Sequence, residues 1–277
     1  MHAPRRIEDL REGGMALSER ARQAMTDART DPEAAHRVAG WYRGGEKGLL
    51  QSPESAFRLE LRAAEGGHLE AQRCVAWAYY VGVGVKVDHA AAATWFGEAA
   101  ERGDRDAQFN LGVAFRQGEG TPQNYELAAE WFQRAVDQGH SDAMVSLAAL
   151  YNDGHGVEQD HAYANALYRG AVEAENNNTP ASFNLGLSYF FEGCGVDKVM
   201  ASALSFWQRA ADQGHSDAQY VIGCTYVNGA SGYSYSKNIQ LARKYIKASA
   251  AQGDVEAVAA LKDWNACAHC GAAAVSA

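Results

Sequence analysis

Two identical tetrapeptides combine the three side chains of a hydrolase triad. They are Gly139-His140-Ser141-Asp142 and Gly214-His215-Ser216-Asp217. Serine would act as nucleophile, histidine as base, and aspartate as the group that orients the histidine. A triad is needed only once, however, whereas this tetrapeptide recurs in front of predicted helices. Serine and aspartate there accept hydrogen bonds from free backbone N–H groups. The pattern favours helix capping by Ser and Asp, with a hydrolase kept as a second alternative.

Three glycine loops resemble phosphate-binding loops in composition. They are Gly82-Val83-Gly84, Gly118-Glu119-Gly120 and Gly154-His155-Gly156, and none is followed by the Lys-Ser/Thr of a P-loop. Each also joins two predicted helices, whereas a P-loop joins a strand to a helix. Turn formation explains them, because glycine adopts the positive φ angles that close helix ends. We therefore predict no small-molecule substrate.

One cysteine spacing is typical of a metal site, in Cys267-Ala268-His269-Cys270. Two thiolates hold half of a tetrahedral zinc site, and a stable site needs four ligands. We expect no cofactor here, with Cys267 and Cys270 as a half-site that only a longer chain would complete. The total of five cysteines is odd, which favours free, partly buried thiols in a reducing compartment.

The charge balance argues against nucleic acid as a partner. The 277 residues include 25 Lys and Arg against 34 Asp and Glu, a formal charge of −9, whereas phosphate-backbone binding needs clustered Lys and Arg. No run approaches the roughly 20 apolar residues of a membrane span, and the N-terminus lacks the apolar region of a signal peptide. The expected location is the cytoplasm by default.

A repeat of 36 to 39 residues runs through most of the chain. Its clearest copies begin at Gly103, Gly139 and Gly214, and each places an alanine four residues later. Periods of this length are typical of helical solenoids. The anchor alanines of successive copies are Ala34, Ala71, Ala107, Ala143, Ala181, Ala218 and Ala257.

Each copy predicts two helices. Ala107, Leu111, Gly112 and Phe115 lie at offsets 0, 4, 5 and 8 from the anchor and so share one helical face. A second apolar stripe follows after the glycine loop. The chain therefore predicts an all-α, right-handed superhelical solenoid of antiparallel helical hairpins. We expect the glycine or alanine at offset five to let neighbouring hairpins stack closely.

The order Ala-x3-Leu-Gly-x2-Tyr/Phe-x2-Gly-x-Gly-Val, followed by Ala-x2-Trp-Phe-x2-Ala-Ala-x2-Gly, resembles the Sel-one-like repeat family, a relative of the tetratricopeptide repeats. The resemblance covers residues from about Asp31 to Trp264. It implies a non-catalytic adaptor or scaffold that binds a protein or peptide partner.

We divide the chain into three parts. Residues 1–30 are an N-terminal amphipathic capping helix or linker, 31–266 are the solenoid of about six units with the last incomplete, and 267–277 are a tail. The tail resembles the start of a MYND-type zinc finger. Either the chain is the repeat portion of a longer MYND regulatory protein, or the two tail cysteines are incidental.

The groove of the solenoid is the predicted partner site. Positions opposite the stacking face carry aromatic and asparagine side chains, which supply apolar anchors and pair with a peptide backbone. Packing of these aromatics against the next repeat is the alternative. The predicted groove residues are Arg73, Trp77, Tyr80, Phe109, Asn110, Val113, Arg116, Asn152, Phe183, Asn184, Leu187, Phe190 and Tyr220.

Overall fold

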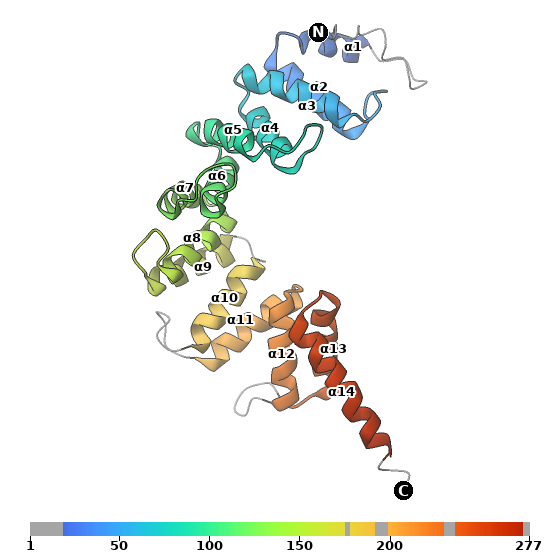
Figure 1. Ribbon diagram of the computed structural model, residues 1–277, viewed down its shortest axis with the longest axis vertical. Helices are drawn as coiled ribbons and strands as arrows, with labels where there is room; N and C mark the ends of the chain where they lie inside the picture. The colour runs from blue at the N-terminus through green and yellow to red at the C-terminus, as the bar shows by residue number, and fades with distance from the viewer. Residues whose placement is uncertain (1–18, 175–177, 192–198, 230–235, 274–277) are drawn as a thin grey trace. The chain divides into compact units, whose positions relative to one another are not determined.

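The computed structural model describes residues 19–174, 178–191, 199–229 and 236–273, with side chains to residue 264, and within these ranges all regular secondary structure is helical (Figure 1). The helices are α1 (Glu19–Asp27), α2 (Pro32–Gly44), α3 (Pro53–Glu65), α4 (Leu69–Val81), α5 (His89–Glu101), α6 (Arg105–Gln117), α7 (Tyr125–Asp137), α8 (Ser141–Asp153), α9 (His161–Ala174), α10 (Thr179–Phe190), α11 (Met200–Asp212), α12 (Ser216–Asn228), α13 (Ile239–Ala251) and α14 (Val255–Ala273).

The chain forms two compact units, Met1–Gln138 and Gly139–Ala277. In the first unit α2 pairs with α3, α4 with α5, and α6 with α7, and α3–α4 and α5–α6 contacts join successive hairpins. In the second unit the hairpins are α8–α9, α10–α11 and α12–α13, and α14 packs on α13. The predicted all-α architecture of consecutive helical hairpins is confirmed. Below, the even-numbered member of each hairpin is its first helix and the odd-numbered member its second.

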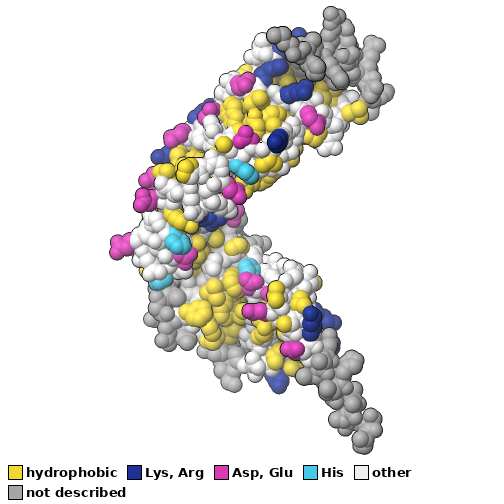
Figure 2. Space-filling model, viewed as in Figure 1, with side chains coloured by type: hydrophobic (Ala, Val, Ile, Leu, Met, Phe, Trp, Pro, Cys, Tyr) yellow, Lys and Arg dark blue, Asp and Glu magenta, His cyan; other side chains and the backbone are white. Residues whose placement is uncertain are grey.

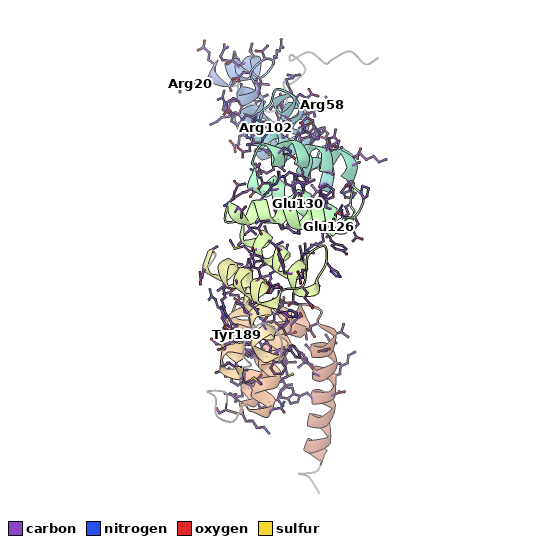
Figure 3. The ribbon with its side chains drawn as sticks, turned by 90° about the vertical axis from the view of Figure 1, so that its left-hand side faces the viewer. Arg20, Arg58, Arg102, Glu126, Glu130 and Tyr189 are labelled. Atoms are coloured by element: carbon purple, nitrogen blue, oxygen red, sulfur yellow. The ribbon has the colours of Figure 1, made fainter. Side chains whose placement is uncertain are left out.

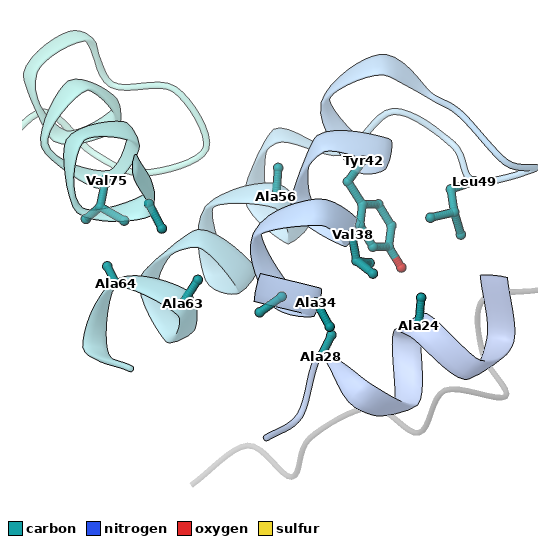
Figure 4. Close-up of a cluster of buried hydrophobic side chains, with 12 residues drawn as sticks. Ala24, Ala28, Ala34, Val38, Tyr42, Leu49, Ala56, Ala63, Ala64 and Val75 are labelled. Atoms are coloured by element: carbon teal, nitrogen blue, oxygen red, sulfur yellow. The ribbon is translucent and has the colours of Figure 1, made fainter. Parts of the chain in front are cut away.

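The core of the first unit begins where α1 packs on α2. Ala24, Val38 and Tyr42 form one buried cluster with Ala63 and Val75, so apolar side chains of four helices meet in it (Figure 4). Only part of the amphipathic helix predicted within residues 1–30 falls in the described residues, where α1 spans Glu19–Asp27. At the other end, α14 runs to Ala273, past the predicted boundary between the solenoid and the tail at residue 266.

Short polar side chains cap the N-termini of the second helices α5, α7 and α13. The side chains of Asp88, Asn124 and Asn238 each accept a hydrogen bond from the backbone N–H three residues later. Such caps satisfy donors that have no partner inside the helix. The first helix α6 ends at Gly118, whose φ of 75° is the left-handed conformation that glycine supplies at low cost.

The helices after the Gly-His-Ser-Asp tetrapeptides are capped by the histidine. The prediction that Ser and Asp cap them is wrong. Nδ1 of His140 accepts the N–H of Ala143, and Nδ1 of His215 accepts that of Ala218. His68 caps α4 in the same way. The imidazole occupies the position of Asp104, which caps α6. A neutral imidazole has one acceptor nitrogen, so it can replace the carboxylate.

The small residue at offset five serves a different contact from the one predicted. A Cβ added to Gly112 would lie 2.7 Å from the ring of Phe132, which is on α7, the partner of α6 in the same hairpin. Gly186 meets Trp207 and Gly223 meets Ile246 in the same manner. These residues let the two helices of one hairpin approach, and do not chiefly set the distance between hairpins.

A buried glutamine next to the anchor alanine connects neighbouring hairpins. Gln108 donates a hydrogen bond to the carbonyl of Ala100, and its Oε1 accepts one from Gln138. Gln72 and Gln219 make the equivalent bonds in their own repeats. Each such glutamine satisfies polar groups that the stacked helices would otherwise bury without partners.

Candidate functional site

Two adjoining pockets lie in the first unit. The larger has a volume of about 430 Å³ and the smaller about 310 Å³. Trp77, Phe96 and Asn110 line both pockets. Concave, mainly apolar sites with a few polar groups are the usual form of a binding site.

Aromatic side chains from four helices build these pockets. Trp77 and Tyr80 come from α4, with ring centroids 5.7 Å apart. Phe57 of α3 and Phe96 of α5 complete the larger pocket, and Phe109 of α6 lines the smaller. The Trp77 side chain is 51% exposed, so a large apolar surface meets solvent at the boundary between the pockets.

Most of the polar side chains at the pockets form ion pairs or hydrogen bonds with neighbouring residues. Nε of Arg73 lies 3.2 Å from Asp104, and a second guanidinium nitrogen lies 3.4 Å from Asp106. The amide nitrogen of Asn110 donates to the carbonyl of Asp106. These bonds fix the orientation of Arg73 and Asn110.

Glu119 differs, because its Oε2 is buried and has no hydrogen-bond partner among the described residues. Glu119 lines the smaller pocket and interacts through its carboxylate with the Tyr80 hydroxyl. Burial raises the pKa of Tyr80, and the hydrogen bond to Glu119 raises it further, so the hydroxyl stays a donor. A buried carboxylate oxygen without a partner is costly, so a donor that reached this oxygen after a side-chain movement would stabilise it.

The structure brings seven predicted groove residues together at these pockets. Phe57, Phe96 and Glu119 were not predicted, because all of the predicted groove residues lie on the first helix of a repeat. The seven are Arg73, Trp77, Tyr80, Phe109, Asn110, Val113 and Arg116.

The other six predicted residues lie in the second unit and are half-buried. Phe183 stacks on His215 with ring centroids 4.4 Å apart, and Phe190 lies 5.3 Å from Trp207. Leu187 packs against the same core, Asn152 bonds His161, and Tyr220 bonds Cys224. Asn184, on α10, completes the set.

Cysteines in the described residues match the expectation of free, partly buried thiols at Cys74 and Cys224. Cys194 lies outside the described residues. Cys267 and Cys270 lie on α14, and their side chains also lie outside the described residues. None of the described helices is both long and apolar enough to cross a membrane.

Comparison with known proteins identifies the class. The Sel1 repeat model matches residues 32–68, 69–104, 105–140, 141–176, 179–215 and 216–254, so the chain belongs to the Sel1 repeat family. This match ends before the tail cysteines, and the resemblance of the tail to a MYND finger has no support. No curated protein matches the sequence.

Among solved structures, the chain is similar to a Sel1 repeat protein from Oxalobacter formigenes, with 28% identity and a TM-score of 0.72 over 82% of this chain and 90% of that one. It is also similar to c5321, a protective antigen of uropathogenic Escherichia coli with an SLR fold, with 29% identity and a TM-score of 0.46 over 82% of this chain. The match spans about half of that antigen, 55% of its length.

Proposed function

We propose that the protein is a non-catalytic adaptor that binds an extended or helical peptide of a partner protein at the two pockets of the first unit. Sel1 repeat proteins generally take part in protein–protein interactions, which supports this role. The observation that carries the proposal is the pair of aromatic-lined pockets that meet at the exposed Trp77.

Exposed apolar surface surrounds the site. All of the large exposed apolar side chains described in the first unit lie between residues 50 and 87, on or beside the elements that form the pockets. Figure 2 shows hydrophobic side chains gathered into patches on the molecular surface. Such patches mark interaction sites when they are larger than scattered single residues. The set is Leu50, Trp77, Val81, Val83 and Val87.

The polar groups define what the partner must offer. Asn110 lines both pockets, where its amide can pair with a peptide backbone. Glu119 favours a partner with a backbone N–H or a basic side chain, which would reach its buried Oε2 after a side-chain movement. Large apolar partner residues would fill the space between Phe57, Trp77 and Phe96.

Selection from a random peptide display library tests this function. Peptides chosen by the wild-type chain should bind Trp77→Ala at least about 30-fold more weakly, since loss of a central aromatic anchor costs roughly 2 kcal/mol or more. Phe191→Ala is the matched control, because Phe191 is 53% exposed in the other unit. Equal loss of affinity in both variants, or in neither, would rule out these pockets as the site.

A further inference from the structure

Three chemically distinct ligand groups meet beside the larger pocket, and two of the three residues, Glu60 and Cys74, line it. His36 comes from α2, Glu60 from α3 and Cys74 from α4, and each offers a ligand atom within 4.8 Å of the other two. Nδ1 of His36 lies 2.8 Å from Oε2 of Glu60. The Glu60 side chain is only 5% exposed, and Cys74 is half-buried.

Glu60 breaks the pattern of the repeat. Glu60 lies eight residues after Ser52, the N-cap of α3. At the equivalent position, all of the remaining second helices, α5, α7, α9, α11 and α13, bury a large side chain. A buried carboxylate in place of such a residue costs free energy unless it has a compensating partner. Departures from a local rule of this kind concentrate at functional sites. The equivalent residues are Phe96, Phe132, Tyr168, Trp207 and Ile246.

An ion network accounts for part of this arrangement. Nη1 of Arg43 lies 2.6 Å from Oε1 of Glu60, and His36 holds Oε2. The thiol of Cys74 makes a hydrogen bond with Arg43. The ion pairs of the network do not require a thiol at this position. Both Glu60 and Cys74 line the pocket, so an ion has an entry path and room for a water ligand.

We propose that His36, Glu60 and Cys74 form a zinc-binding site. Imidazole, thiolate and carboxylate are the ligands that Zn²⁺ takes at about 2.0 to 2.3 Å, and three protein ligands with one water give its tetrahedral geometry. The harder ions Mg²⁺ and Ca²⁺ prefer oxygen ligands alone. On binding, the thiol proton and any proton on the coordinating nitrogen pass to solvent.

The charges of the proposed site balance. One thiolate and one carboxylate neutralise the dication, so Arg43 can remain on Oε1 of Glu60 and orient the ligand. Arg43 need only release the sulfur of Cys74, and its side chain is 46% exposed. Nδ1 of His36 and Oε2 of Glu60, now 2.8 Å apart, must also separate so that the ion can lie between them. Zinc binding therefore requires small local movements of the Arg43, His36 and Glu60 side chains.

The test uses the full chain with Cys74 as its only thiol, made by changing Cys194, Cys224, Cys267 and Cys270 to serine. Zn²⁺ affinity is measured by competition with a chromophoric chelator, and Co²⁺ reports thiolate coordination through its near-ultraviolet charge-transfer band. We expect one ion per chain. The matched control has Cys224 as its only thiol and should show neither signal, because no His and Glu ligands accompany that thiol in a described cluster.

In this single-thiol chain, Cys74→Ser, Glu60→Gln and His36→Gln should each weaken binding at least about tenfold. Unchanged helical circular dichroism shows which variants remain folded. If Glu60→Gln unfolds, Cys74→Ser decides the result, because Cys74 is only half-buried. Absence of Zn²⁺ binding by the single-thiol chain overturns the proposal. So does equal binding by the Cys224-only chain or by Cys74→Ser.

Discussion

Three histidines, His68, His140 and His215, cap first helices through a ring nitrogen that must carry no proton. At His215, protonation would remove this acceptor and place a positive charge at a helix N-terminus, where the helix dipole is unfavourable to it. The stability of the N-terminus of α12 is therefore linked to pH.

We predict that His215→Asn reduces the acid sensitivity of the protein. Burial lowers the pKa of His215 from its usual value of 6.5, against a smaller opposing effect of Asp217. The unfolded chain thus binds this proton first as the pH falls, so the stabilisation is complete above 6.5 and is lost as the pH drops through the folded value. Asparagine caps without titrating. Urea midpoints at about pH 7.5 and 5.5 should differ less in the variant than in the wild type.

His36 provides a contrast of opposite sign. Its hydrogen bond to Glu60 raises its pKa, so its stabilisation is complete below pH 6.5 and is lost as the pH rises through the folded value.

A larger fall in the urea midpoint of His215→Asn than in that of the wild type on acidification would refute the capping account for His215.

Helix pairs are held together by matching a small residue on the first helix with a large one on the second. Gly112 with Phe132, Gly186 with Trp207 and Gly223 with Ile246 are three instances. Close packing leaves no room for extra atoms at these contacts.

We predict that Gly112→Leu lowers the free energy of unfolding by about 1 to 3 kcal/mol, because the new side chain would overlap the ring of Phe132. Gly97→Leu is the control, since an added Cβ there meets nothing within 4 Å and leucine favours the helix. Thermal unfolding measures both. Equal melting temperatures for the two variants would show that the hairpin contact is not close-packed.

Contacts between hairpins depend on buried glutamine. Gln108→Leu leaves the carbonyl of Ala100 and the amide of Gln138 without this partner, so we expect a loss of about 1 to 3 kcal/mol. Gln117→Leu, at an exposed position on the same helix, should change stability by less than about 0.5 kcal/mol. Denaturant unfolding compares them, and similar losses would argue against a role for the buried bonds.

At the scale of the whole molecule, the repeat arithmetic predicted the hairpins well because the 36- to 39-residue period recurs with strong helical patterning. It did not predict the second-helix side chains at the pockets, Phe57 and Phe96, because helical period alone does not show which neighbouring repeat a residue reaches. The grouping of His36, Glu60 and Cys74 was missed for the same reason. One signal was present in the sequence, namely the acidic residue at an otherwise apolar repeat position.

The charged, exposed face of the second helices is the alternative binding surface for a partner. Glu126 and Glu130 are exposed on α7, a second helix, and Figure 3 shows their positions. Mixed charges on such a face are adequately explained by contact with water, and exposed ion pairs add little stability. A partner that depends on this face would bind with strong salt dependence, whereas binding at the aromatic pockets should depend weakly on salt.

The most direct test of the adaptor account is a crystal structure of the full chain with a display-selected peptide. We predict that the peptide lies across the two pockets of the first unit, with an apolar side chain against Trp77 and Phe96 and a hydrogen bond to Asn110 or Glu119. A peptide seated on the second unit, or on the exposed face of α7, would contradict the account.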